Sequence, residues 1–219
     1  MSLALALANS YGITMCADKR TSFTKISPAS ERPLLFSSFD GIQKLFMTKS
    51  GHGIAYTGTL ILSDGVSISA EIAKAINSLP SNGITVQEEL TIIKQHLRQH
   101  GIIQDSVVDF IGAEISNGAN NIVCTKLAED TFTPMVDSTG IGMCYSGEEQ
   151  ISVGLLNFVN SNIAIFSPQL SVDFLRFALQ TVSGIQYYSG EPQTVSHDCD
   201  ILFISQTGSQ WITSQNEIT

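Results

Sequence analysis

Strand-type and helix-type segments follow one another in blocks along this chain. Two strand hairpins come first, then two helices, several strands, two more helices and two closing strands. Segments that alternate singly predict parallel βαβ units, whereas blocks of this kind predict separate layers of antiparallel sheet and helix. We therefore expect an α+β fold, a four-layer αββα sandwich with two antiparallel sheets between two helix layers, formed by residues 1–219 as a single domain.

The first hairpin is defined by alternation with a period of two. Residues 2–8 place leucines on one side and small residues on the other, and Ile13–Asp18 alternates again after a cluster of turn residues. If the numbers of the two residues in each facing pair of this hairpin add up to about 20 or 21, Ser2 lies opposite Asp18 or Lys19. The open end of the hairpin then carries polar groups.

A second hairpin is expected over residues 42–58, with its turn at the Ser-Gly-His-Gly cluster. If the numbers of paired residues in this hairpin add up to about 102 or 103, Lys44 lies beside Gly58 or Thr59. The intervening residues 21–41 are rich in Ser, Thr and Pro, so we interpret them as a surface excursion.

Apolar residues at helical spacing predict four helices. Asp64 caps the first, and the capping box of residues 85–88 opens the second. Two more are expected over 148–159 and 172–185, the last with Ser171 as a cap. The remaining strands are predicted over 107–115, 121–127, 132–136, 140–144, 200–205 and 210–213.

Composition excludes some partners and favours others. The net charge of −9 and the absence of a Lys/Arg cluster argue against nucleic acid and anionic membranes, and no apolar run reaches the ~18 residues that a membrane span needs. Only 14% of residues are charged, which favours a surface covered by another subunit over a compact monomer with a Ser/Thr/Asn-rich surface.

No metal site is expected from the cysteines and histidines. The 4 cysteines lie far apart and are interpreted as free thiols in a reducing cytoplasm. The histidines show no shared spacing and are interpreted as turn or surface residues. In the segment 197–200, strand alternation would split the potential ligands between two faces of a sheet.

The N-terminus suggests a chemistry of its own. A small second residue predicts removal of Met1 by methionine aminopeptidase, which leaves Ser2 with both a hydroxyl and an α-amine. An α-amine has a pKa of about 7.7–8.0 and can activate a serine, which is otherwise a poor nucleophile. The charge of Lys44 would lower the pKa of both groups, Asp18 would hold Lys44, and the Gly58 N–H could stabilise an oxyanion.

Five segments resemble a known family. Ser2–Ala4 with Gly12–Arg20 resembles the start of a mature proteasome β subunit, an N-terminal-nucleophile hydrolase. Ile42–Leu45 and Tyr56–Thr59 are similar to that family's lysine and glycine segments. Farther on, Tyr145-Ser146-Gly147 resembles its Gly-Ser-Gly, and Gln186–Gly190 resembles its Asp-x-x-Ser-Gly. The resemblance covers essentially the whole chain.

The resemblance assigns roles to individual residues. The catalytic set that it implies is Ser2, Asp18, Lys44, Gly58, Ser146, Gln186 and Ser189, and the implied substrate pocket is Thr21, Ser22, Ile42, Phe46, Tyr56 and Leu60. The chain departs from the pattern where Ser2 replaces threonine, where Gln186 replaces aspartate, and in residues 21–41, which exceed the usual connection.

The function implied is that of an N-terminal serine hydrolase of amide bonds, a peptidase in a cytoplasmic, ring-like homo-oligomer. Its substrates would be peptides or unfolded protein, an ATP-driven unfoldase could be a partner, and no cofactor is needed. Two alternatives stay open. One is an amidase for small amides on the same fold; the other is a catalytically silent assembly subunit, favoured by Gln186 and by any retention of Met1.

Overall fold

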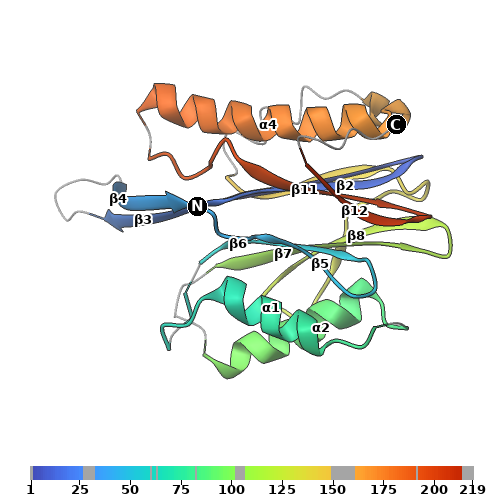
Figure 1. Ribbon diagram of the computed structural model, residues 1–219, viewed down its shortest axis with the longest axis horizontal. Helices are drawn as coiled ribbons and strands as arrows, with labels where there is room; N and C mark the ends of the chain where they lie inside the picture. Colours follow the sequence, from blue (N-terminus) through green and yellow to red (C-terminus); the bar gives the residue numbers. More distant parts are fainter. Residues whose placement is uncertain are drawn as a thin grey trace.

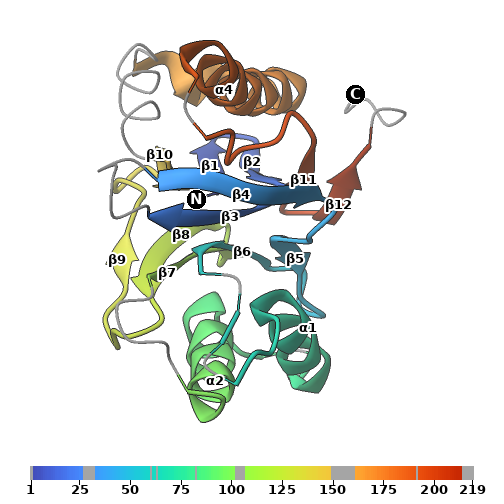
Figure 2. The same ribbon diagram turned by 90° about the vertical axis from the view of Figure 1, so that its left-hand side faces the viewer.

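Two five-stranded antiparallel sheets lie face to face in the computed structural model. One long helix covers the outer side of one sheet and two shorter helices cover the outer side of the other (Figures 1 and 2). The structure describes residues 2–26, 33–59, 61–62, 64–81, 83–101, 107–148, 161–190 and 192–213.

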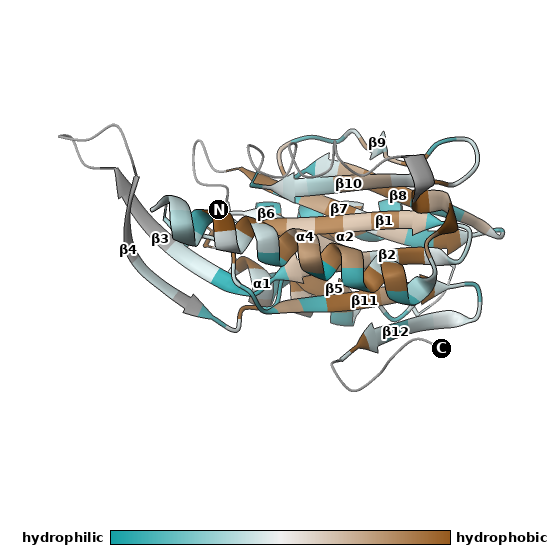
Figure 3. Ribbon diagram, turned by 90° about the horizontal axis from the view of Figure 1, so that it is seen from above, coloured by the Kyte–Doolittle hydropathy of each residue, from teal (hydrophilic) through white to brown (hydrophobic). Residues whose placement is uncertain are grey.

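The sheet under the long helix has the strand order β10-β1-β2-β11-β12. Its strands are β1 (Leu3–Asn9), β2 (Gly12–Asp18), β10 (Gly142–Gly147), β11 (Cys199–Ser205) and β12 (Gly208–Ile212). Along β1 the leucines pack toward the long helix, and the alanines pack toward the opposite sheet. Both faces of β1 are therefore buried, and the apolar strands β1 and β2 lie beneath the helix in Figure 3.

The second sheet has the order β5-β6-β7-β8-β9. Its strands are β5 (Leu45–Met47), β6 (Gly53–Gly58), β7 (Val108–Ser116), β8 (Ala119–Lys126) and β9 (Thr133–Pro134). Its inner face meets the alanine face of β1, and its outer face packs on the shorter helices.

The two hairpins test the predicted pairings. Ala4 pairs with Ala17, which agrees with the larger of the sums predicted for the first hairpin. In the second hairpin Leu45 pairs with Ala55, so the prediction that Lys44 lies beside Gly58 or Thr59 is wrong. The turn is tighter than expected, because the Thr48 N–H donates to the His52 carbonyl. Each residue of one strand therefore pairs with a residue at least two positions earlier than predicted on the other strand.

Three α-helices are described: α1 (Ile68–Ser78), α2 (Val86–Gln99) and α4 (Pro168–Ser189), with a 3-10 helix η1 (Ser161–Ile165). The predicted capping box at Thr85 and Glu88 is confirmed. The N-caps of α1 and α4 are Ser67 and Ser167, not Asp64 and Ser171. No helix in the described ranges is long and apolar enough to cross a membrane.

The predicted surface excursion of residues 21–41 contains most of two strands that were not expected. A separate two-stranded sheet forms from β3 (Arg20–Ile26) and β4 (Pro33–Asp40) and projects beyond the main sheets near the N-terminus (Figures 1 and 3). Its Thr, Phe and Ile residues favour strands, and a two-pronged Arg20–Asp40 ion pair with contacts of 2.9 and 3.0 Å joins its base.

The predicted four-layer αββα sandwich is also wrong. Strands dominate the described residues, a third sheet is present, and three α-helices accompany them in these ranges. The predicted helix over 148–159 falls almost wholly on residues 149–160, which lie outside the described ranges. The fold is α+β with a preponderance of β structure.

Candidate functional site

Ser2 lies where the ends of several strands meet. It precedes β1, and Gly58 ends β6 of the opposite sheet. The Gly58 N–H donates to the Ser2 hydroxyl at 3.2 Å, and the Ser2 side chain is almost fully buried. A backbone N–H from one sheet thus contacts a hydroxyl from the other.

A buried ion pair lies beside this contact. Lys44 Nζ and Asp18 Oδ1 are 2.9 Å apart, and both side chains are fully buried. Asp18 also accepts N–H bonds from Leu3 at 2.9 Å, Arg20 at 2.9 Å and Ser196 at 3.4 Å. Lys44 donates in addition to the Arg20 carbonyl. Burial lowers the pKa of Lys44, and the Asp18 charge opposes that shift.

Two glycines are required by the backbone around Ser2. Gly58 has φ of 99°, and a Cβ there would stand 1.9 Å from the Val107 carbonyl oxygen. Gly147 has φ of 106°, and a Cβ there would stand 1.7 Å from the Ser2 carbonyl oxygen. Only glycine combines a positive φ with such close backbone approach, so the three strand ends can converge here.

Ser146 reaches the same region from β10 through its neighbours. Its hydroxyl lies 2.5 Å from the Thr57 hydroxyl and 3.5 Å from Asp109 Oδ2. A cavity of ≈ 580 Å³ opens beside it between β7, β8 and β10, and Asp109, Tyr145, Ser146 and Gly147 are among its lining residues.

The Asp109 carboxyl is expected to make the stability of the folded protein depend on pH. Burial raises its pKa, and its Oδ1 has no hydrogen-bond partner among the described residues. A raised folded pKa means that the folded state binds more protons, so ionisation of Asp109 costs stability as pH rises through that pKa. We expect Asp109→Asn to be more stable than wild type at pH 7 and to lose this advantage below pH ~3.8, as measured by urea unfolding across pH. A constant advantage at every pH would contradict this prediction.

Gln186 holds a network that includes an unpredicted acid. Its Oε1 accepts the N–H groups of Thr194 and Val195 at 3.0 and 3.1 Å. Its Nε2 donates to the Thr194 hydroxyl and to Glu148 Oε2 at 2.8 and 3.1 Å. The Glu148 N–H in turn donates to the Ser2 carbonyl at 3.0 Å. A buried carboxylate therefore adjoins the amide that replaces the expected aspartate. The sequence feature that could have indicated Glu148 is its place directly after Ser146-Gly147.

The other predicted catalytic residue lies apart. Ser189 is exposed at the end of α4, and its hydroxyl donates to the Gln186 carbonyl at 3.3 Å. The structure thus forms two contacting pairs, Ser2–Gly58 and Asp18–Lys44, with Leu3 next to Ser2 donating its N–H to Asp18. Ser146 and Gln186 are linked to this region through intermediates.

The predicted pocket residues have different environments. Thr21 is buried, and its hydroxyl has no partner among the described residues; Ser22 donates to the Gln193 carbonyl at 3.4 Å. Phe46 and Tyr56 stack with ring centroids 6.4 Å apart within the core under α1 and α2.

Two further pocket positions complete that prediction. Ile42 is half-buried, and its N–H donates to the Lys19 carbonyl at 3.1 Å. Leu60 lies outside the described residues. Of the predicted lining, Thr21 and Ile42 flank the strand ends, whereas Phe46 and Tyr56 belong to the helix-covered core.

Comparisons with known proteins define the fold likeness. No family model matches the chain, and no curated protein matches it. Among solved structures, a Gly-1 mutant of Anbu from Hyphomicrobium sp. strain MC1 superposes with TM-score 0.62 at 13% identity, over 99% of this chain and 89% of that one. Anbu (ancestral beta-subunit) from Yersinia bercovieri gives TM-score 0.60 at 14% identity, over 97% and 87%.

These matches correct the resemblance drawn from the sequence. The assignment to the proteasome β-subunit-like N-terminal-nucleophile hydrolases, as a bacterial proteasome-related protein, is wrong as a statement of family. At 13–14% identity the solved structures show a common fold, and no family model supports the assignment. The local sequence segments were too short to carry family membership. The chain shares its fold with these Anbu structures, one of which is described as an ancestral beta-subunit.

Proposed function

We propose that this chain is a hydrolase of amide bonds with Ser2 as its N-terminal nucleophile. The observation that carries the proposal is the contact between the Ser2 hydroxyl and the Gly58 N–H at 3.2 Å, beside the fully buried Asp18–Lys44 pair. Cleavage of the Met1–Ser2 bond is required, because it supplies the α-amine that acts as the base.

The first step is attack on the substrate. The Ser2 Oγ adds to the amide carbonyl carbon while its α-amine accepts the hydroxyl proton. The Gly58 N–H donates to the oxyanion of the tetrahedral intermediate. Collapse of that intermediate breaks the C–N bond, and the proton passes from the α-amine to the leaving amine.

The second step releases the product. Water loses a proton to the same α-amine and attacks the Ser2 ester, and the Ser2 oxygen leaves and regains a proton. The Lys44 charge favours the unprotonated amine and the developing alkoxide, and Asp18 fixes the position of Lys44 through their 2.9 Å contact.

We further propose peptides or unfolded protein as substrates and a homo-oligomer as the working assembly. The low charged fraction of 14% supports a surface that is partly covered by other copies. The fold likeness to structures titled as ancestral β-subunits supports the same assembly. An ATP-driven unfoldase is the partner that delivery of folded protein to such an assembly would require.

The proposal is tested with two chains that differ by one methionine. Each is released from a cleavable N-terminal fusion, one beginning at Ser2 and the other at Met1. Both are treated with a peptide β-lactone and analysed by intact mass and peptide mapping. We expect one adduct, on Ser2, only in the chain that begins at Ser2. Equal labelling of the two chains, or labelling elsewhere, would contradict the proposal.

A catalytically silent assembly subunit is the second candidate. It is favoured by Gln186, whose amide is engaged by residues 194–195 and by Glu148 and which itself supplies no charge. For this candidate we expect a homo-oligomer in light scattering and no adduct in either chain. An adduct on Ser2 together with hydrolysis of small amides alone would instead identify an amidase.

A further inference from the structure

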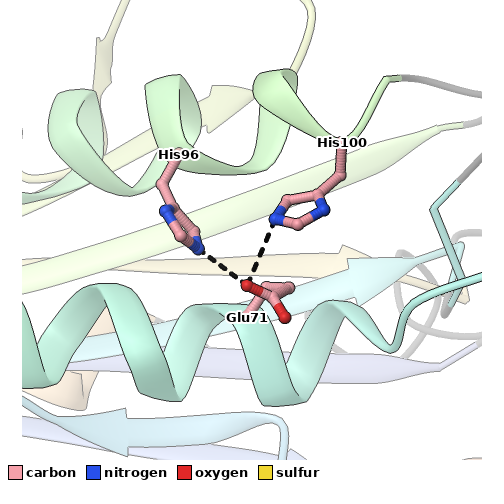
Figure 4. A group of neighbouring side chains, drawn as sticks. All are labelled: Glu71, His96 and His100. Carbon is pink, nitrogen blue, oxygen red and sulfur yellow. Dashed lines mark hydrogen bonds and ion pairs between the residues drawn. The ribbon is translucent and has the colours of Figure 1, made fainter. Parts of the chain in front are cut away.

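A cluster of potential metal ligands lies on the outer helix pair. Glu71 of α1, His96 of α2 and His100 just after α2 converge in the gap between the helices (Figure 4). The expectation that these histidines share no spacing is therefore wrong, because residues four apart on a helix project from the same face.

The distances between the ligand atoms suit one ion. Glu71 Oε2 lies 2.8 Å from His96 Nε2 and 3.3 Å from His100 Nε2. The three ligand atoms all lie within 4.8 Å of one another. Bonds of 2.0–2.2 Å in a tetrahedral zinc site place ligand atoms about 3.4 Å apart. Small side-chain adjustments would therefore place all three atoms around a common centre.

Neighbouring groups orient the ligands as they do in metal sites. Asp64 Oδ2 lies 2.7 Å from His100 Nδ1, so the Asp64 carboxylate accepts the Nδ1 proton and leaves Nε2 as the atom directed at Glu71. A carboxylate behind a histidine in this way fixes the tautomer and raises the basicity of the ligand nitrogen. Lys74 contacts the other Glu71 oxygen, Oε1, at 2.6 Å, which leaves Oε2 for the ion.

Burial and charge make the cluster receptive to a cation. The Glu71 side chain is 2% exposed, whereas His96 and His100 are 31% and 28% exposed. The Glu71 carboxylate thus lies on the buried side of the cluster, and the imidazoles of His96 and His100 are accessible to solvent.

We propose that Glu71, His96 and His100 bind one divalent transition-metal ion of the Zn²⁺ type, which joins α1 to α2. Two imidazoles and one carboxylate form a ligand set that Zn²⁺ accepts, with water completing the tetrahedron on the exposed side. The site lies on the outer face of the β5–β9 sheet, so its role is to fix the helix pair, independently of hydrolysis at Ser2.

The test is metal binding to the full chain after treatment with a chelator. Titration calorimetry with Zn²⁺ is expected to give one site per chain, and Co²⁺ is expected to give the visible absorption of a tetrahedral N/O site. His96→Gln is expected to weaken binding at least about 100-fold, and Asp64→Asn about 10–100-fold, because it removes the charge behind His100. Zn²⁺ should also raise Tm in wild type but not in His96→Gln.

His197→Gln is the matched control, because His197 is an exposed histidine near Cys199 and outside the cluster. It is expected to leave the affinity unchanged. Loss of binding in this control instead of in His96→Gln would overturn the assignment. Absence of one-to-one binding in wild type would also overturn it and would show that Glu71 and the histidines form an ion-pair cluster only. Circular dichroism confirms that each variant is folded, and His100→Gln provides a second ligand variant.

Discussion

Replacing Ser2 by alanine is expected to lower kcat/KM for a fluorogenic peptide amide at least about 10³-fold, because the variant lacks the oxygen that forms the ester. The fold should persist. Among the described residues the Ser2 hydroxyl accepts one hydrogen bond, from the Gly58 N–H, and loss of one such bond costs about 1 kcal/mol. Alanine is also small, so the Met1 bond remains a substrate for methionine aminopeptidase. The measurement is hydrolysis rate together with intact mass.

Two further variants make this prediction specific. Ser2→Thr retains both hydroxyl and α-amine and is expected to stay active, with its side-chain rotamer restricted by the added methyl group. Ser189→Ala removes a hydroxyl that is exposed at the end of α4 and is expected to match wild type. Full activity of Ser2→Ala would eliminate Ser2 as the nucleophile, whatever the behaviour of the other two variants.

Lys44→Met is expected to destabilise the chain by about 3–5 kcal/mol and to abolish hydrolysis. The methionine fills a similar volume but leaves the Asp18 carboxylate buried without its counter-ion. The three backbone N–H bonds to Asp18 remain, which favours the lower end of that range. The free energy of unfolding in urea measures the loss.

The double variant Asp18→Asn/Lys44→Met separates charge from packing. It removes both charges together, so it is expected to be more stable than Lys44→Met alone. Lys126→Met is the control, because Lys126 forms an exposed ion pair with Glu129 and should cost no more than about 1 kcal/mol. Equal stabilities of Lys44→Met and Lys126→Met would show that the buried pair does not hold the strand ends together.

The two sheets are joined at the candidate site by the Gly58 N–H, which donates to the Ser2 hydroxyl, and by Lys44, which lies just before β5 and contacts Asp18 at the end of β2. The bond from the Glu148 N–H to the Ser2 carbonyl lies within the sheet of β1. If hydrolysis occurs at Ser2, its geometry therefore depends on the packing of one sheet against the other. Substitutions of the β1 alanines that pack on the opposite sheet would therefore change the position of Ser2.

The sequence alone determined the features that depend on local spacing. Alternation with a period of two predicted the first hairpin, and its pairing placed Ser2 near Asp18. The capping box at Thr85 was predicted correctly from the sequence, because its two bonds join residues within one helical turn. The block order of strands and helices predicted α+β structure and the three described α-helices, and the remaining predicted helix lies almost wholly outside the described residues.

The tertiary structure decided which distant groups meet. Lys44 reaches Asp18 although its hairpin register differs from the prediction, because a long side chain can span a shift that strand pairing cannot. Glu71 meets His96 only because α1 and α2 pack side by side. Spacing along a chain fixes the face on which a side chain lies, but the partner on that face depends on packing between elements far apart in sequence.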